Sequence, residues 1–399
     1  MAFAVIFFWI SLFILVYTYF GYGLILLFLN KFVRKTTKRY EISKIEFPAI
    51  TLVVPVFNEE AVLLSKIENC FRLDYPEAQL KILFISDGST DASFEIISRF
   101  PRIEHLFQLE RAGKMAAINR AMAFVTTPYV LFSDANSFLN TSCIKKIIPH
   151  YAIELVGGVA GEKKVEYSRR HAAMGFGEGL YWKYESILKQ LDSNFNTVIG
   201  AAGEVFSMRT SLFTPLPSDT ILDDLNLSLK ICLNGFKVVY EPDAYAIEAP
   251  SANLNEESKR RIRIAAGAFQ SILKQGLLNQ VFRFPVLGFQ FASRRIMRWI
   301  FCPIALLLLF FTNLYIYNQQ PSTGYLVFLY LQQAFYIGAG FGWLFYGTNA
   351  RLSVFFIPFY FVFMNVSLVQ GFIKFVLGKQ SVLWEKSVRS TLQTSNNKT

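Results

Sequence analysis

The chain has 399 residues, of which 53% are hydrophobic, and phenylalanine alone occurs 41 times. This length allows one large domain or one domain with a membrane part, and composition favours the second because the apolar residues gather at both ends of the chain. Many of the basic residues behind the net charge of +11 flank those apolar ends, which indicates anionic lipid and not nucleic acid as their partner. The four cysteines are scattered, so neither a disulfide framework nor a zinc site is expected.

Residues 1–30 are predicted to form an N-terminal transmembrane helix, because residues 4–30 carry no charge and are long enough to cross a bilayer. The segment lacks the basic start and the cleavage site of a signal peptide; a buried helix of a soluble core is the alternative. Residues 31–47 form a basic linker, which predicts a cytoplasmic domain at the inner (plasma) membrane. The basic residues of this flank are Lys31, Arg34, Lys35, Lys38 and Arg39.

Residues 48–275 show short β-rich runs that alternate with amphipathic stretches. Strands are expected at residues 49–56, 80–86, 105–109 and 129–134, with helices between them. This alternation predicts an α/β, Rossmann-like domain with a mostly parallel sheet, in which ligands bind beyond the carboxyl ends of the strands.

The second half of this domain is less regular. The elements expected there are an aromatic amphipathic helix at 175–191, a turn into a strand at 200–208, a helix at 223–232, two strands broken at Pro242 and a basic helix at 258–269.

The C-terminal part is predicted to lie at and in the membrane. Residues 276–298 suit an amphipathic interfacial helix, residues 299–378 hold about three transmembrane helices, and residues 379–399 form a polar tail. Four spans in all would put the C-terminus outside, whereas the basic residues that follow the last span argue for inside. Either one apolar segment is re-entrant or the charge rule fails here.

Asp134 and Asn136 follow the fourth expected strand directly. Side chains two apart on an extended backbone share a face, so a carboxylate and an amide oxygen can hold a divalent cation there. An ordinary Asp/Asn turn is the alternative.

Two further groups of polar residues follow the earlier strands. A carboxylate fixed at a strand end, such as Asp87, can accept a hydrogen bond from a pyrimidine or a ribose, and Gly88 permits close approach. Lys114 begins a helix and can meet a phosphate. The alternatives are a turn that caps the next helix and a solvated lysine.

Asp223 and Asp224 open the helix at 223–232. A carboxylate there can remove a proton from an incoming hydroxyl in one inverting displacement, although capping of the helix is an alternative. Arg260, Arg261 and Arg263 offer guanidinium groups to a diphosphate, although a solvated or lipid-facing basic helix is equally simple.

Taken in order, these segments resemble the membrane-embedded glycosyltransferases of family 2, which include cellulose, chitin, hyaluronan and poly-N-acetylglucosamine synthases. The resemblance covers residues 50–270 and rests on VVPVFNE, ISDGSTD, GKMAAINRA, SDAN, LDDLNLSLK and VVYEPDA. It implies a GT-A fold, a nucleotide-sugar donor that is usually a UDP-sugar, a Mg²⁺ or Mn²⁺ ion, and inversion at the anomeric carbon.

The resemblance also implies roles for single residues. Asp224 would be the catalytic base beside Asp223, and Asp134 and Asn136 would occupy the metal-binding position. The residues implied to bind the nucleotide are Pro55, Asn58, Glu59, Asp87, Gly88, Lys114 and Asp134. Those implied to meet the diphosphate or the acceptor are Gly203, Glu204, Arg260, Arg261 and Arg263.

The chain departs from the family pattern at two places. Asn136 replaces the second carboxylate of the metal pair and contributes a neutral oxygen. Arg260 and Ile264 stand where processive members carry the Gln and Trp of QxxRW, which puts processive polymerisation in doubt.

The expected function is therefore transfer of a sugar to a glycan or lipid-linked acceptor at the inner membrane face, in polysaccharide biosynthesis. One alternative is a processive synthase that extrudes its polymer, with an oligomer or other export components as possible partners. Alternatives of another class are a transporter and a non-catalytic nucleotide-binding membrane protein.

Overall fold

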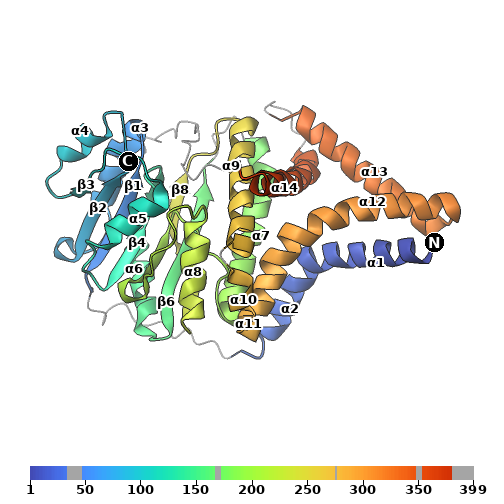
Figure 1. Ribbon diagram of the computed structural model, residues 1–399, viewed down its shortest axis with the longest axis horizontal. Coiled ribbons are helices and arrows are strands. Elements are labelled where there is room, and N and C mark those ends of the chain that lie inside the picture. Colours follow the sequence, from blue (N-terminus) through green and yellow to red (C-terminus); the bar gives the residue numbers. More distant parts are fainter. Residues whose placement is uncertain (34–46, 167–171, 275, 347–352, 380–399) are drawn as a thin grey trace, which may run out of the picture.

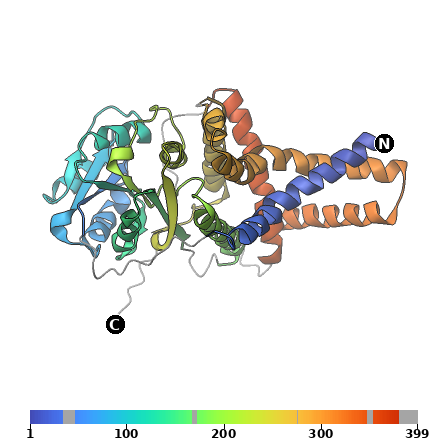
Figure 2. The same cartoon turned by 90° about the horizontal axis from the view of Figure 1, so that it is seen from below.

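The computed structural model describes residues 1–33, 47–166, 172–274, 276–346 and 353–379. It consists of an α/β domain and a group of long helices that extend away from one side of it (Figure 1). The view from below shows the same division, with the N-terminus at the far end of the helical part (Figure 2). Most of the basic linker and almost all of the polar tail lie outside the described residues.

The sheet has eight strands in the order β3-β2-β1-β4-β7-β6-β8-β5. Its first half is parallel and consists of β1 (Ile50–Val56), β2 (Leu80–Ser86), β3 (Glu104–Leu106) and β4 (Tyr129–Phe132). All seven residues of β1 are buried, as expected for a central strand that is covered on both faces. The predicted α/β fold is confirmed in this half.

The second half of the sheet mixes directions. It contains β5 (Ser137–Leu139), β6 (Val156–Val165), β7 (Phe206–Arg209) and β8 (Lys237–Glu248). Strand β7 runs antiparallel to both β4 and β6, whereas β6 and β8 are parallel.

The expected break at Pro242 is wrong, because β8 is one strand. Its pairing with β6 passes from Ala160↔Tyr240 to Glu162↔Tyr245, so an irregularity holds the intervening residues, including Pro242. A proline is tolerated there because its missing N–H is not needed in the ladder.

Helices cover both faces of the sheet and pack on two apolar clusters. The first cluster includes Val53, Met115 and Leu225, and the second includes Leu52, Ile67 and Ile147. Among the helices that contribute to these clusters are α3 (Glu60–Phe71), α4 (Ser93–Ser98), α5 (Lys114–Met122), α6 (Cys143–Ile147), α8 (Asp223–Leu233) and α10 (Leu277–Val281).

Two long helices stand between the sheet and the membrane part, namely α7 (Ala172–Phe195) and α9 (Leu254–Phe269). The Asn253 side chain caps α9 by accepting a hydrogen bond from the Glu256 amide at 3.0 Å. A π-helical turn, η7 (Gln270–Lys274), continues α9.

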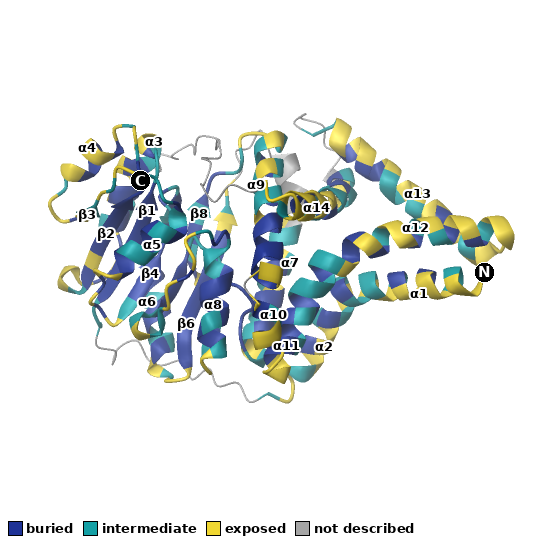
Figure 3. Ribbon diagram, viewed as in Figure 1, coloured by how far each residue is buried: buried dark blue, intermediate teal, exposed yellow. Residues whose placement is uncertain are grey.

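Three helices of the described residues are long and apolar enough to cross a membrane, and they span Ala2–Leu29, Pro285–Gln319 and Val354–Val376. Figure 3 shows many exposed residues along the projecting helices, as expected for lipid-facing surfaces. The elements of this part are α1 (Ala2–Val16), η1 (Tyr17–Gly21), α2 (Tyr22–Leu29), α11 (Pro285–Phe291), η8 (Ala292–Phe301), α12 (Cys302–Gln319), α13 (Thr323–Leu344) and α14 (Ser353–Val376). Helix α13 was expected to span but is not among the three, so the number of spans stays a prediction.

Buried ion pairs join the membrane part to the domain. Arg294 of η8 lies 3.1 Å from Glu185 and 2.8 Å from Asp192, both on α7, and Arg298 also pairs with Glu185. Tyr22 of α2 donates a hydrogen bond to Asp192. The placement of residues 276–298 in the membrane interface stays a prediction, but these two arginines face the domain and not lipid.

Candidate active site

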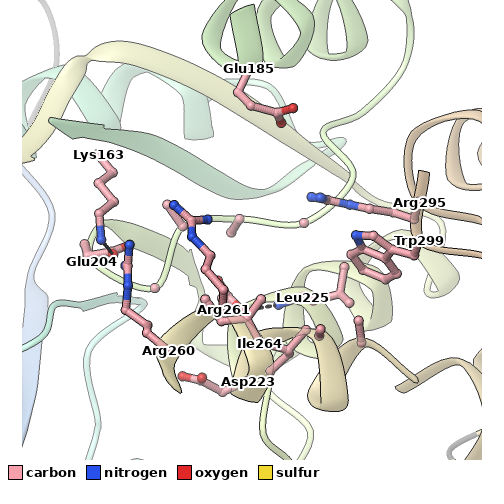
Figure 4. A pocket seen from close by; sticks show the side chains of 18 of the residues that line it. Lys163, Glu185, Glu204, Asp223, Leu225, Arg260, Arg261, Ile264, Arg295 and Trp299 are labelled. Atoms are coloured by element: carbon pink, nitrogen blue, oxygen red, sulfur yellow. Dashed lines mark hydrogen bonds and ion pairs between the residues drawn. The ribbon is translucent and has the colours of Figure 1, made fainter. Parts of the chain in front are cut away.

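A cavity of about 290 Å³ lies between the domain and the membrane-side helices. Its walls come from α5, the loop after β4, residues 200–204, the start of α8, and α7, α9, η8 and α14. Figure 4 shows charged side chains from several of these elements converging on it.

Lys114 lies at the centre of the carboxylates in this cavity. Its Nζ is 2.9 Å from Asp134 Oδ1 and 3.2 Å from Asp223 Oδ2. Burial disfavours the ammonium form of Lys114, but Asp134 and then Asp223 outweigh burial and raise its pKa. Burial likewise raises the pKa of Asp134, against the opposing effect of Lys114.

Asp224 lies beside this group at the start of α8. Burial and the neighbouring Asp223 raise its pKa to about 7, although Lys114 opposes the shift. A Cβ atom on Gly203 would lie 3.8 Å from Asp224 Oδ2 and 3.5 Å from Lys114 Nζ, so the loop backbone approaches both groups closely. Asp224 is therefore a cavity carboxyl group whose pKa lies near neutrality.

Glu204 is held by a residue that the sequence did not reveal. Lys163 of β6 pairs with both Glu204 and Glu248. Burial opposes ionisation of Glu204, but Lys163 lowers its pKa overall. Glu204 is thus a fixed carboxylate in the cavity wall.

Arg260 and Arg261 line the cavity, and both pair with Glu257 of their own helix. Arg261 Nε lies 2.6 Å from Glu257 Oε1, and its Nη2 donates to the Tyr360 hydroxyl of α14 at 2.6 Å. Arg263 is not among the lining residues.

Of the residues expected to seat the nucleotide, Lys114 and Asp134 line the cavity. The other five lie at the carboxyl ends of β1 and β2, outside its lining. Asp87 is buried and accepts hydrogen bonds from the amides of Ala112 at 2.9 Å and Gly113 at 2.7 Å. It therefore fixes the segment that leads into Lys114. Gly88 is needed because its φ is +69° and a Cβ atom would lie 2.8 Å from the Arg111 nitrogen.

Three other members of this group lie close by. Asn58 has a φ of 53° and accepts a hydrogen bond from the Thr90 amide at 2.8 Å. The amide of the buried Glu59 donates to Ser93 Oγ at 3.1 Å, and Pro55 is buried within β1.

The donor set in the cavity fits a divalent cation that is held partly by substrate. Asp134 and Asp223 face one point, which Lys114 Nζ occupies, and carboxylate oxygens suit Mg²⁺ or Mn²⁺. In the described part of the chain no group of three or more His, Cys, Asp or Glu could hold a metal. One or two carboxylates with substrate phosphates are a usual site for such an ion. Asn136 is half-buried and does not line the cavity.

Part of the sequence matches a known protein family. Residues 51–213 match the model of the glycosyl transferase family 2. The chain contains a family 2 glycosyltransferase domain. This match ends before Asp223, so the proposed base and the basic helix rest on the geometry and on the sequence motifs.

Two curated relatives share sequence with this chain. A poly-beta-1,6-N-acetyl-D-glucosamine synthase of Staphylococcus aureus is 24% identical over 282 residues, which cover 66% of this chain and 65% of that protein. A beta-monoglucosyldiacylglycerol synthase of Nostoc is 26% identical over 207 residues, which cover 48% of this chain and 42% of that protein. The matches thus span less than two thirds of each relative.

A solved structure confirms the GT-A fold. It is a mannosyltransferase from Pyrobaculum calidifontis in complex with GDP-mannose and Mn²⁺. The TM-score is 0.66 at 18% identity, and the match covers 94% of this chain and all of that one.

Other lining residues were not predicted from the sequence. Tyr181, Trp182, Arg295, Trp299 and Met364 line the cavity at its membrane side. The aromatic helix at 175–191 was recognised, but nothing in its pattern indicated which of its faces meets the site.

Proposed function

We propose that the chain is an inverting glycosyltransferase. It transfers a sugar from a nucleotide-sugar, a UDP-sugar in the first instance, to a glycan or lipid-linked acceptor at the cytoplasmic face of the membrane, in polysaccharide biosynthesis. The observation that carries the proposal is the grouping of Asp224, Lys114, Asp134 and Asp223 in a cavity that also touches the membrane-side helices.

Asp224 is the general base of the reaction. It takes the proton of the acceptor hydroxyl while that oxygen bonds to the anomeric carbon, and the bond from this carbon to the diphosphate oxygen breaks. The nucleoside diphosphate leaves with the electron pair. A pKa of about 7 suits this role, because the carboxylate is both present and basic near neutral pH.

Lys114, positioned by the loop before it, stabilises the negative charge of the leaving diphosphate. Asp87 holds the amides of Ala112 and Gly113, so that Lys114 is placed between Asp134 and Asp223. Asp134 and Asp223 would hold the Mg²⁺ or Mn²⁺ ion, which when bound neutralises the developing charge of the diphosphate.

The relatives widen the range of donors and acceptors to be tested. Their names indicate a polymer of N-acetylglucosamine, a glucosylated diacylglycerol and a GDP-mannose donor. Ile264, where processive enzymes carry a Trp, lines the cavity and favours short products. The length of the product made from a labelled donor separates single addition from polymerisation.

The experiment that tests the function measures release of nucleoside diphosphate from UDP-sugars and GDP-mannose by the purified full chain. We expect turnover with one donor by the wild type and a loss of at least about a hundredfold in Asp224→Asn. Asp243→Asn is the matched control, because Asp243 is exposed and outside the cavity. Equal turnover by Asp224→Asn would reject the base, and binding of nucleotide without turnover by the wild type would indicate a non-catalytic protein.

A further inference from the structure

One end of the cavity lies against the membrane part of the molecule. Its wall there consists of Arg295 and Trp299 from η8 and of Met364 and Leu368 from α14. Helices η8 and α14 belong to two of the three helices that are apolar and long enough to cross a membrane. The cavity therefore joins the carboxylates of the transferase domain to the side of two candidate spans.

Arg295 differs from the other cations of this cavity. Every other lining lysine or arginine has a carboxylate at ion-pair distance: Lys114 has Asp134 and Asp223, Lys163 has Glu204 and Glu248, Lys189 has Glu162, and Arg260 and Arg261 have Glu257. Within the described residues Arg295 has no such partner. Its neighbours Arg294 and Arg298 already occupy Glu185 and Asp192.

The Arg295 guanidinium is held firmly, although the carboxylate that acts on it, Glu185, already pairs with Arg294 and Arg298. Its Nη2 donates to the Ile199 carbonyl at 2.5 Å, and its guanidinium carbon lies 5.2 Å from the centre of the Trp299 ring. A Cβ atom on Gly200 would lie 2.7 Å from this Nη2, so the glycine makes room for the guanidinium. Its Nε is buried and has no hydrogen-bond partner among the described residues. Figure 4 shows Arg295 and Trp299 side by side, entering the cavity from the side opposite Lys163 and Glu204.

We propose that Arg295 binds the phosphate of an anionic, lipid-linked acceptor. The apolar part of this acceptor lies along Trp299, Met364 and Leu368, and a hydroxyl of its head group reaches Asp224. The inference rests on the proposed function and names the class of its acceptor.

Phosphate is favoured because a half-buried guanidinium with no carboxylate at ion-pair distance is compensated best by an anion with several oxygens. The donor diphosphate is assigned to the opposite end, where Lys114, Asp134 and Asp223 meet. The transfer step is unchanged: the acceptor hydroxyl forms the new bond, Asp224 takes its proton, and the nucleoside diphosphate leaves.

The first test supplies labelled donor to membranes from cells that express the full chain. We expect a labelled product that partitions into organic solvent and binds an anion exchanger. A product that is water-soluble, or lipid-soluble but neutral, would overturn the inference while leaving the transferase proposal intact. If neither product nor nucleotide release appears with any donor, the proposed function itself fails, and this inference fails with it.

The second test compares Arg295→Gln with Arg283→Gln, an equal change of charge at an exposed arginine just before α11. We expect Arg295→Gln to lower transfer by about tenfold or more and to change the Kd of the nucleoside diphosphate by less than about twofold. Arg283→Gln should behave as the wild type. Equal transfer by both variants, or an equal loss of nucleotide affinity in Arg295→Gln, would overturn the inference.

Two further variants, Arg295→Lys and Trp299→Ala, test the same inference if Arg295→Gln folds poorly. Arg295→Lys keeps the charge and should retain more than about a third of the transfer rate. Trp299→Ala removes apolar wall and should raise the KM of the acceptor at unchanged nucleotide Kd. Loss of transfer in Arg295→Lys, or no change of acceptor KM in Trp299→Ala, would contradict the assignment.

Discussion

At the scale of single residues, the buried charged groups of the site shift one another's pKa values. Asp224 is adjacent to Asp223, and Asp134 and Asp223 share Lys114. A carboxyl group whose pKa is raised by burial and by a like charge is protonated below that pKa and charged above it. If Asp224 is the base, as proposed, its carboxylate form and the reaction rate increase together as the pH rises through neutrality.

This charge arrangement predicts the pH dependence of the reaction. Since the pKa of Asp224 is raised to about 7, kcat/KM should fall about tenfold for each pH unit below that value. Initial rates of nucleotide release measured from about pH 5 to about pH 9 check this. The acid limb should move to lower pH in Asp223→Asn, because Asp223 raises the pKa of Asp224. A flat profile across neutrality would contradict the assignment.

Lys66 holds the loop that carries Asp134. It is completely buried, and its Nζ donates to Ser133 Oγ at 2.8 Å and to the Ser137 carbonyl at 2.5 Å, on either side of Asp134. Burial lowers the pKa of Lys66.

Lys66→Met should therefore leave the Ser133 hydroxyl and the Ser137 carbonyl without this partner and lower the free energy of unfolding by about 1–3 kcal/mol. It should also raise the Mn²⁺ concentration that gives half-maximal activity. Denaturant unfolding and Mn²⁺ titration of the activity measure the two effects. Lys81→Met is the control, because Lys81 is exposed and bonds only to Thr126 among the contacts that the structure gives it. If both variants behave alike, Lys66 has no positioning role.

At the scale of elements, the sequence predicted most of the strands and helices that carry the site. Asn58, Asp87 and Asp134 were placed at strand ends because buried apolar runs stop abruptly before them, and β1, β2 and β4 end there. The meeting of Asp134 with Asp223 could not be predicted, because strand and helix patterns report local burial and not which distant segments come together.

The same reason explains the residues that were missed. Lys163, Arg295 and Trp299 meet at the cavity only because β6 and η8, which are far apart in the sequence, both contribute to its wall. The continuous β8 was missed because the irregularity around Pro242 depends on its partner β6.

Close packing of α14 against α9 positions the side chains of α14 that line the cavity on its membrane side. A Cβ atom on Gly371 of α14 would overlap Ala265 and lie 2.9 Å from the Ile262 carbonyl oxygen, both on α9. Gly371→Ala should therefore destabilise the protein by about 1–3 kcal/mol and lower transfer. Thermal unfolding in detergent measures this. Gly340→Ala, at a glycine of α13 with open space around it, should be neutral, and equal melting temperatures would contradict the packing.

At the scale of the whole molecule, the buried ion pairs make the membrane helices and the domain a single unit. Glu185 pairs with both Arg294 and Arg298, so Glu185→Gln leaves two buried arginines with weaker partners. We expect a loss of about 3–5 kcal/mol in stability and a lower transfer rate. Glu154→Gln, at an exposed carboxylate, is the control for thermal unfolding, and an unchanged Glu185→Gln would show that the two parts are not coupled here.

The central claim is that one inverting displacement takes place at Asp224, between a nucleotide-sugar and an acceptor that reaches the cavity from the membrane side. The most direct test is NMR of the glycosidic bond in the product that the purified full chain makes from an α-linked donor. The account predicts a β-linked product from the wild type and none from Asp224→Asn. An α-linked product, or the same product from both proteins, would contradict it.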